Sequence, residues 1–242
     1  MEKLEGIVAV VGNYGSGKTE VSINFAVDRK LAGIDVRIAD LDLVNPYFRT
    51  REARGPLSDL GIDVVLPPEE LLQADLPVLS PAVAGMLRQH GRLTVLDVGG
   101  EDVGARVLAT LADSLRDKHV HMLLVVNPLR PFTGTVAGCL QIRDKIEKAS
   151  KITVNGIIGN ANLIDETSVK DIYKGYDFAR ALSAESSLPL VFITVAVELL
   201  PAIDSKRFDC PILAIKRQLV PPWKKPVEFK QISSGSATKA LP

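Results

Sequence analysis

The chain has 242 residues, of which 46% are hydrophobic and 24% are charged. This composition indicates one large globular domain or two small ones, and it excludes a largely disordered protein. Its 29 Lys and Arg residues balance its 29 Asp and Glu residues, and this neutrality argues against a nucleic-acid partner. The sequence shows neither a signal-peptide pattern nor a run of the ~18 apolar residues that span a bilayer. We therefore expect a cytoplasmic protein without a membrane partner.

The most specific pattern lies near the N-terminus. Residues 6–11 are short, apolar and β-branched, as in a buried strand, and a helix is predicted over 19–31. Between them the pattern G-x-x-x-x-G-K-[ST] is matched at every fixed position by Gly12, Asn13, Tyr14, Gly15, Ser16, Gly17, Lys18 and Thr19. Such a loop directs backbone N–H groups and a helix N-terminus at phosphate oxygens. All eight residues are predicted to bind a nucleotide, with Lys18 at the β- and γ-phosphates and the Thr19 hydroxyl on Mg²⁺.

The next predicted strand, residues 36–40, ends in two carboxylates, Asp40 and Asp42. One carboxylate can hold a metal ion while the other accepts a proton from an attacking water; the alternative is an aspartate that caps a turn. Residues 45–51 then combine aromatic and guanidinium groups, which is typical of a switch or an acceptor site. An equally open interpretation has Tyr47 and Phe48 anchoring this loop to the core, with the arginines in solvent.

A third motif closes the predicted strand at residues 93–97. Asp97 is followed by Val98, Gly99 and Gly100, which is the Walker B arrangement. It combines an acidic residue that holds Mg²⁺, usually through water, with glycines that let the backbone approach the γ-phosphate. Because the carboxyl ends of parallel strands lie at one edge of a sheet, these carboxylates are predicted to converge on the phosphate loop.

Further strands are predicted at 62–66, 119–126, 152–158 and 190–195, and further helices at 81–90, 101–115, 133–148 and 168–184. The strands are apolar throughout, which indicates burial of both sheet faces. Strands that alternate with helices predict an α/β fold with three layers, α/β/α, and a mainly parallel sheet of about seven strands. This domain is predicted to span residues 1–219. Residues 220–242 are predicted to form an extended or disordered tail, whose start the single tryptophan, Trp223, pins to the body.

Together, the loop at 12–19, the Asp40-Leu41-Asp42 segment and the Asp97–Gly100 segment resemble the SIMIBI class of P-loop NTPases, in particular its MinD/ParA and CobQ/CobB-like branch. The resemblance covers residues 6 to about 205. It implies the P-loop NTPase fold, ATP and Mg²⁺ as cofactors, and Asp40 as the catalytic residue that activates water beside Lys18. It also implies that Asp42 and Asp97 lie near Mg²⁺ with Thr19, and that Gly100 contacts the nucleotide. Many members carry a second lysine that reaches across a homodimer, and here Asn13 occupies that position, which weakens the expectation of such a dimer.

A polar segment follows the predicted strand at 152–158. Members that the chain resembles place an asparagine here against the base, so Asn160 is the first candidate for a base contact and Asn162 the second. The alternative is an asparagine-rich turn without a ligand. The guanine signature N-K-x-D is absent, which favours ATP over GTP.

Three functions agree with these motifs. The leading hypothesis is a slow Mg²⁺-dependent ATPase, that is, a nucleoside-triphosphate hydrolase that acts as a switch for an unknown protein partner. The second is an ATP-dependent ligase or kinase, similar to the dethiobiotin or cobyrinate synthetases, that acts on a small-molecule substrate. The third is a nucleotide-gated binding module that does not hydrolyse its nucleotide.

Overall fold

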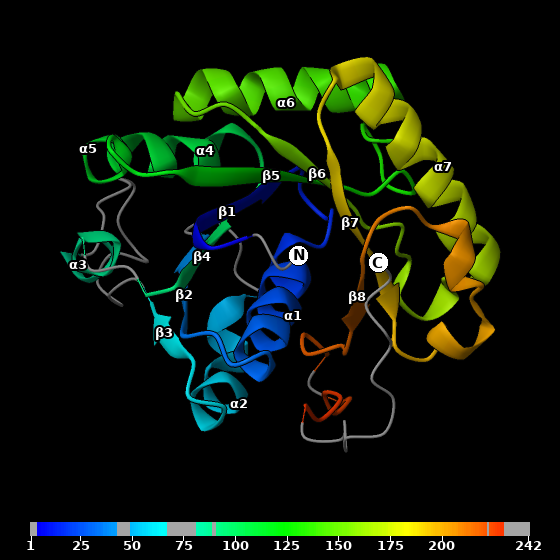
Figure 1. Ribbon diagram of the computed structural model, residues 1–242, viewed down its shortest axis with the longest axis horizontal. Helices are drawn as coiled ribbons and strands as arrows, with labels where there is room; N and C mark the ends of the chain where they lie inside the picture. Colours follow the sequence, from blue (N-terminus) through cyan, green and yellow to red (C-terminus); the bar gives the residue numbers. More distant parts are fainter. Residues whose placement is uncertain (1–3, 43–48, 67–80, 89–90, 222, 230–242) are drawn as a thin grey trace.

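The computed structural model describes residues 4–42, 49–66, 81–88, 91–221 and 223–229. Its strands are β1 Gly6–Gly12, β2 Val36–Leu41, β3 Asp63–Val65, β4 Leu93–Val98, β5 Val120–Val126, β6 Gly156–Gly159, β7 Leu190–Ala196 and β8 Ile212–Ile215. The described strands form one eight-stranded sheet in the order β3-β2-β4-β1-β5-β6-β7-β8, and every adjacent pair is parallel (Figure 1). The carboxyl ends of the central strands therefore share one edge.

Helices lie on both faces of this sheet. The longer ones are α1 Lys18–Leu31, α3 Pro81–Arg88, α4 Glu101–Thr110, α6 Val136–Ser150 and α7 Val169–Ser186, and the shorter ones are η1 Thr50–Ala53, α2 Arg54–Asp59, α5 Ala112–Leu115, η3 Ile164–Glu166, η4 Leu200–Ala202 and η5 Ser205–Arg207. In Figure 1, α4, α5 and α6 run along one side of the sheet, with α1 and α2 on the other. The predicted three-layer α/β/α fold is thus confirmed.

The side chains of β1 explain why its sequence does not alternate between apolar and polar residues. Val8 and Val10 pack in the hydrophobic cluster that contains α1 and α2, whereas Ile7 and Ala9 pack in the cluster that contains α3, α4 and α6. Successive residues of a strand point to opposite faces of a sheet, so a strand covered on both sides is apolar throughout. All four side chains are at most 1% exposed.

The sheet has one strand more than the predicted number. The missed strand is β8, which pairs with β7 at the edge of the sheet; its four apolar residues are too few to show a period. The predicted strand at 152–158 is shorter, because β6 begins at Gly156. The predicted helix at 101–115 is two helices, α4 and α5, which are separated at Leu111.

The start of the predicted tail returns to the domain. The backbone N–H of Val227 donates to the carbonyl of Arg217 at 2.9 Å, and the Gln218 side chain donates to the carbonyl of Val227 at 2.6 Å. Phe229 is buried in the core, whereas Trp223 is 82% exposed. The prediction that Trp223 pins the segment to the body is therefore wrong, because Phe229 does so. Residues 230–242 lie outside the described part of the chain, and the domain boundary at 219 stays a prediction.

No helix in the described ranges combines the length and the apolar character needed to cross a lipid bilayer.

Candidate functional site

The phosphate loop is wound between β1 and the first turn of α1. The Ser16 N–H donates to the carbonyl of Asn13 at 3.2 Å, and the Lys18 ammonium donates to the same carbonyl at 3.0 Å. α1 begins at Lys18, and the residue before it, Gly17, has a φ of 88° and gives the helix no side-chain cap. The N–H groups of the first turn of α1 therefore have no side-chain acceptor at the cap position, which is the arrangement that binds anions at helix N-termini.

Asn160 supports this loop from below. It follows β6, is 4% exposed, and donates from its amide nitrogen to the carbonyl of Ser16 at 2.6 Å. Its amide oxygen accepts from the Thr194 hydroxyl. A Cβ atom at Gly17 would overlap the Asn160 amide, so a glycine is required there both for its backbone angle and for this approach. The structure thus gives the Asn160 amide a bracing role, and a contact with the base stays a prediction.

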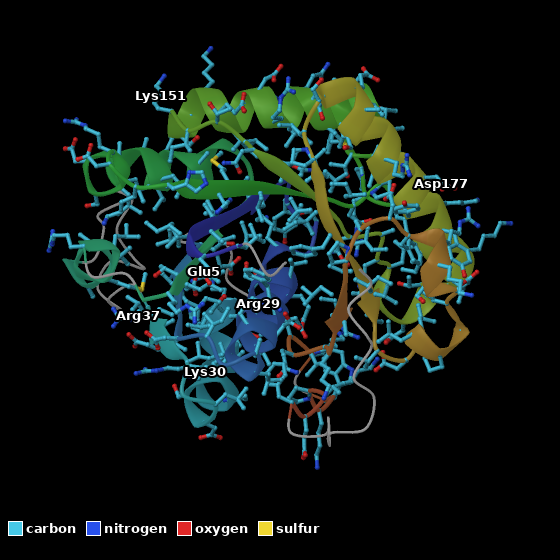
Figure 2. The ribbon with its side chains drawn as sticks, in the orientation of Figure 1. Glu5, Arg29, Lys30, Arg37, Lys151 and Asp177 are labelled. Atoms are coloured by element: carbon cyan, nitrogen blue, oxygen red, sulfur yellow. The ribbon has the colours of Figure 1, made fainter. Side chains whose placement is uncertain are left out.

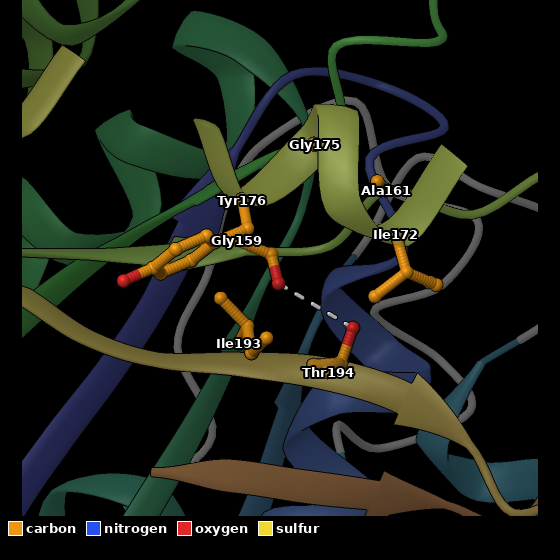
Figure 3. A pocket seen from close by; sticks show the side chains of 7 residues that line it. All are labelled: Gly159, Ala161, Ile172, Gly175, Tyr176, Ile193 and Thr194. Atoms are coloured by element: carbon orange, nitrogen blue, oxygen red, sulfur yellow. Dashed lines mark hydrogen bonds between the residues drawn. The ribbon is translucent and has the colours of Figure 1, made fainter. Parts of the chain in front are cut away.

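The packing behind Asn160 leaves almost no free space. A cavity of about 10 Å³ lies between α7 and the ends of β6 and β7 (Figure 3), which is about the smallest space that holds one water. A Cβ atom at Gly175 would overlap the side chain of Ala161, and the Thr194 hydroxyl also approaches the carbonyl of Gly159 at 3.5 Å. This close packing fixes the position of Asn160.

Asp40 and Asp97 occupy paired positions on β2 and β4, and each is 1% exposed. Asp97 accepts from the Thr50 hydroxyl at 2.7 Å and from the Ser22 hydroxyl at 3.2 Å. Burial, assisted by the neighbouring charge of Asp40, raises the pKa of Asp97 to about 7. The two carboxylates are therefore as close as the motifs predict, but they lie beneath the side chains of η1.

Arg51 forms an ion pair with Asp40, with 2.9 Å between Nε and Oδ2. The other oxygen of Asp40 accepts the N–H of Asp42 at 3.0 Å, and Arg51 also donates to the carbonyl of Asp42 at 3.3 Å. Burial raises the pKa of Asp40, and the Arg51 charge opposes this rise. The interpretation that places the arginines in solvent is wrong, since Arg49 is only 9% exposed. Residues 43–48, and with them the predicted roles of Tyr47 and Phe48, lie outside the described residues.

The glycines after Asp97 bring the end of β4 against the phosphate loop. A Cβ atom at Gly100 would lie 3.2 Å from the backbone nitrogen of Tyr14 and 3.5 Å from Lys18 Nζ. A Cβ atom at Gly99 would lie 3.0 Å from a carboxylate oxygen of Asp42. Any side chain here would therefore crowd the loop, which explains why two glycines follow the strand.

The oxygen donors of this edge fit Mg²⁺ bound together with phosphates. Mg²⁺ takes one or two protein carboxylates and completes its shell with waters and substrate phosphates, and Asp42 lines the same cavity as Lys18 and Thr19. Asp97 lies behind them and can act through water. The described residues contain no group of three or more His, Cys, Asp or Glu side chains that would hold a metal alone. The assignment of Thr19, Asp42 and Asp97 to Mg²⁺ stays a prediction.

One open cavity of about 570 Å³ extends from the phosphate loop along the start of α1, a volume typical of small-molecule sites. The predicted residues that line it are Tyr14, Gly15, Gly17, Lys18, Thr19, Asp42 and Asn160. The predicted residues that do not line it are Gly12, Asn13, Ser16, Asp40, Asp97 and Gly100. The structure thus joins the phosphate loop to Asp42 in one space, with the other two carboxylates beneath its floor.

The far wall of the cavity combines residues that follow the predicted strands at 152–158 and 190–195 with residues that the sequence did not indicate. They come from the loops after β5, β6 and β7 and from the C-terminal segment 215–227, and they include Arg130, Asp165, Glu198, Arg217, Leu219, Val220, Lys224 and Val227. The apolar members of this wall include Leu219, Val220 and Val227, and its charged members are mainly basic. Position after a strand end could have indicated Arg130, but nothing local marks the C-terminal residues.

Glu20 fastens the C-terminal wall to α1. Its carboxylate accepts the backbone N–H of Gln218 at 2.7 Å and that of Leu219 at 3.0 Å, and burial raises its pKa. One turn later, Asn24 exchanges two hydrogen bonds with the backbone of Lys216, at 2.8 and 3.2 Å. The helix that starts at the phosphate loop therefore also holds the opposite wall of the cavity.

No family model matches the chain, and no curated protein matches it. Solved structures with the same fold include the cell division protein FtsY from Thermotoga maritima (23% identity, TM-score 0.56, 81% of this chain and 63% of that one). A second is the signal recognition particle receptor FtsY from Elizabethkingia anophelis in complex with GDP (18% identity, TM-score 0.52, 80% of this chain and 58% of that one). A third is the signal recognition particle 54 kDa protein from Aeropyrum pernix in complex with GDP (17% identity, TM-score 0.51, 80% of this chain and 42% of that one).

The chain thus spans less than two thirds of the length of each of these structures. They belong to the SIMIBI class of P-loop NTPases, and at these identities the likeness is one of fold. The placement in the MinD/ParA branch stays a prediction.

Proposed function

We propose that the chain binds ATP with Mg²⁺ at the loop of residues 12–19 and hydrolyses it slowly, as a nucleotide switch for a protein partner. The observation that carries this proposal is the joining of Lys18, Thr19 and Asp42 in one cavity at the start of α1. The two buried carboxylates beneath that cavity, Asp40 and Asp97, supply the further groups that γ-phosphate chemistry uses.

Each side chain has a role that follows from its position. Backbone N–H groups of the loop and the Lys18 ammonium neutralise phosphate charge, which is the larger part of catalysis in phosphoryl transfer. Thr19 and Asp42 would hold Mg²⁺, with Asp97 acting through water, and the bound ion would supply positive charge that stabilises the phosphates. Asp40 would orient the attacking water.

The contact between Arg51 and Asp40 supports a switch. Asp40 is 1% exposed, and its two oxygens accept from Arg51 and from the Asp42 N–H, so we expect Arg51 to move before Asp40 orients a water. Thr50, next to Arg51, donates to Asp97. Binding of Mg²⁺ and nucleotide at these carboxylates would therefore release η1, and a displaced η1 is a signal that a partner can recognise.

The charges of the far wall favour adenine. Guanine is distinguished by donors at N1 and N2, which need a carboxylate acceptor. Asp165 is the acidic residue of the loop after β6 that lines the cavity, and it is paired with Lys224 at 2.5 Å and with Arg217 at 3.2 Å. Asn162 lines the same cavity, and we assign it the contact with the adenine edge, since an amide can both donate and accept.

Binding and phosphate release, measured together, test this proposal. Lys18→Ala is expected to weaken binding of Mg²⁺·ATP by ~100-fold, because it removes a charge-assisted contact, and to abolish phosphate release. Lys30→Ala is the matched control, since Lys30 lies in the last turn of α1 (Figure 2) and should change neither quantity. Tight binding retained by Lys18→Ala would refute the site assignment. Tighter binding of GTP than of ATP would refute the choice of base.

A further inference from the structure

We propose that Arg130 is a second polyphosphate-binding side chain of this site. The inference rests on the proposed function, because it adds a contact to the nucleotide in the same cavity. Arg130 lies in the loop between β5 and α6, and it lines the cavity together with Lys18 and Asn127. The guanidinium would bind phosphate oxygens from the β5 side of the phosphate loop.

Among the described residues, the Arg130 guanidinium has no hydrogen-bond or ion-pair partner that would give it a structural role. Its Nε atom is buried and makes no hydrogen bond, and across the described ranges no carboxylate or carbonyl pairs with this side chain. Buried N–H groups of protein side chains are nearly always bonded. The other arginine of the cavity wall, Arg217, pairs with Asp165, and Arg51 beneath the floor pairs with Asp40. Arg130 therefore differs from both in presenting its donors without an acceptor from the described residues.

The backbone around Arg130 is held in place. Asn127 is 1% exposed; its side chain accepts the Leu129 N–H at 3.1 Å, and its carbonyl accepts the Arg130 N–H at 3.2 Å and the Thr133 hydroxyl at 2.6 Å. A side chain that starts from so fixed a turn has little freedom at its base, and it loses little entropy when a ligand binds.

The same loop is attached to the phosphate loop itself. The Asn13 side chain donates to the carbonyl of Pro131 at 3.5 Å, and a Cβ atom at Gly12 would lie 2.6 Å from the carbonyl oxygen of Val125, the penultimate residue of β5. Arg130 is thus one residue away from a direct contact with the loop that cradles phosphates.

The chemistry of the two side chains identifies the ligand class. Lys18 supplies a compact charge, whereas a guanidinium presents a planar fork of donors that matches two phosphate oxygens at once. A nucleoside triphosphate offers several such oxygens and carries more negative charge than one ammonium balances. A polyphosphate chain is therefore the group that a cavity with Lys18 and an unpaired arginine accommodates.

Calorimetric titration of the full chain with the Mg²⁺ complexes of ATP, ADP and AMP tests the proposal. Arg130→Ala is expected to weaken ATP binding by ~10- to 100-fold, and the loss should decrease from ATP to AMP. Arg130→Lys should recover part of the ATP affinity. Arg143→Ala is the control, because Arg143 pairs with Asp144 on α6 and does not line the cavity.

A melting curve separates ligand binding from a structural role. Since the guanidinium has no partner among the described residues, Arg130→Ala should melt within about 2 °C of the wild type, a shift of at most about 0.5–1 kcal/mol. ATP affinity of Arg130→Ala within twofold of the wild type would overturn the inference while leaving the proposed function intact, and so would an equal loss for ATP and AMP. A wild-type chain that binds neither ATP nor GTP would overturn both.

Discussion

Replacement of Glu20 by alanine should destabilise the C-terminal segment that forms the far wall of the cavity, while the phosphate loop keeps its own hydrogen bonds. The Glu20 carboxylate accepts two backbone N–H groups of the C-terminal segment, from Gln218 and Leu219, and one from the Asn24 amide. Each backbone N–H that loses this acceptor at a partly buried position costs about 1–2 kcal/mol. We therefore expect Glu20→Ala to lower the free energy of unfolding by roughly 2–4 kcal/mol. Glu20→Gln keeps one acceptor oxygen and should lose about half as much.

Urea unfolding, followed by circular dichroism, measures this loss, and limited proteolysis shows whether segment 216–229 becomes accessible. Glu5→Ala is the control, because Glu5 is a surface residue paired with Arg92 (Figure 2) and such pairs contribute about 0–1 kcal/mol. ATP affinity should fall as well, since Arg217, Leu219 and Val220 line the cavity. A Glu20→Ala variant that loses less than about 1 kcal/mol, with unchanged proteolysis, would refute the role of Glu20 as the anchor of this wall.

Three further outcomes follow from the contacts of the site. Arg51→Ala frees one oxygen of Asp40, so basal phosphate release should rise; a fall would show that Arg51 acts in catalysis instead. The pKa of Asp97 rises from 3.8 to about 7 on folding, so its stabilising effect is complete below pH 4 and is lost as the pH rises through 7. This loss approaches roughly 4 kcal/mol. Melting curves of the nucleotide-free chain should show this decline between about pH 4 and 7, Asp97→Asn should remove the part that Asp97 contributes, and Mg²⁺·ATP should raise the melting temperature more at pH 8 than at pH 6. Asn160→Ala removes the brace beneath the phosphate loop, and titrations should show ATP and GTP affinities falling by the same factor, about tenfold. Asn162→Ala should reduce the preference for ATP over GTP. If Asn160→Ala reduced this preference and Asn162→Ala did not, the base contact would be assigned to Asn160.

The sequence predicts those parts of the site that are contiguous in the chain. The phosphate loop, the carboxylates at Asp40 and Asp42 and the glycines after Asp97 each lie in one short segment, and parallel strands bring their ends to the same edge. The fold class follows from the same alternation of apolar strands and helices.

Other parts of the site depend on contacts between distant segments, which no local pattern encodes. The bond from Asn160 to Ser16 joins residues 144 positions apart, and the bonds from Glu20 to Gln218 and Leu219 join residues almost 200 positions apart. The C-terminal segment has the composition of a tail because it is rich in proline and lysine, although backbone N–H groups that any sequence possesses and the buried side chain of Phe229 attach it to the domain. Likewise, the pairing of Arg51 with Asp40 depends on where η1 packs.

A crystal structure with a non-hydrolysable ATP analogue and Mg²⁺ would show whether the loop of residues 12–19 binds the nucleotide. We expect the β- and γ-phosphates to lie against the backbone of residues 12–19, with Lys18 and Arg130 donating to their oxygens and Arg51 displaced from Asp40. An analogue bound elsewhere on the molecule, or a phosphate loop that stays empty at a saturating concentration of the analogue, would contradict this expectation.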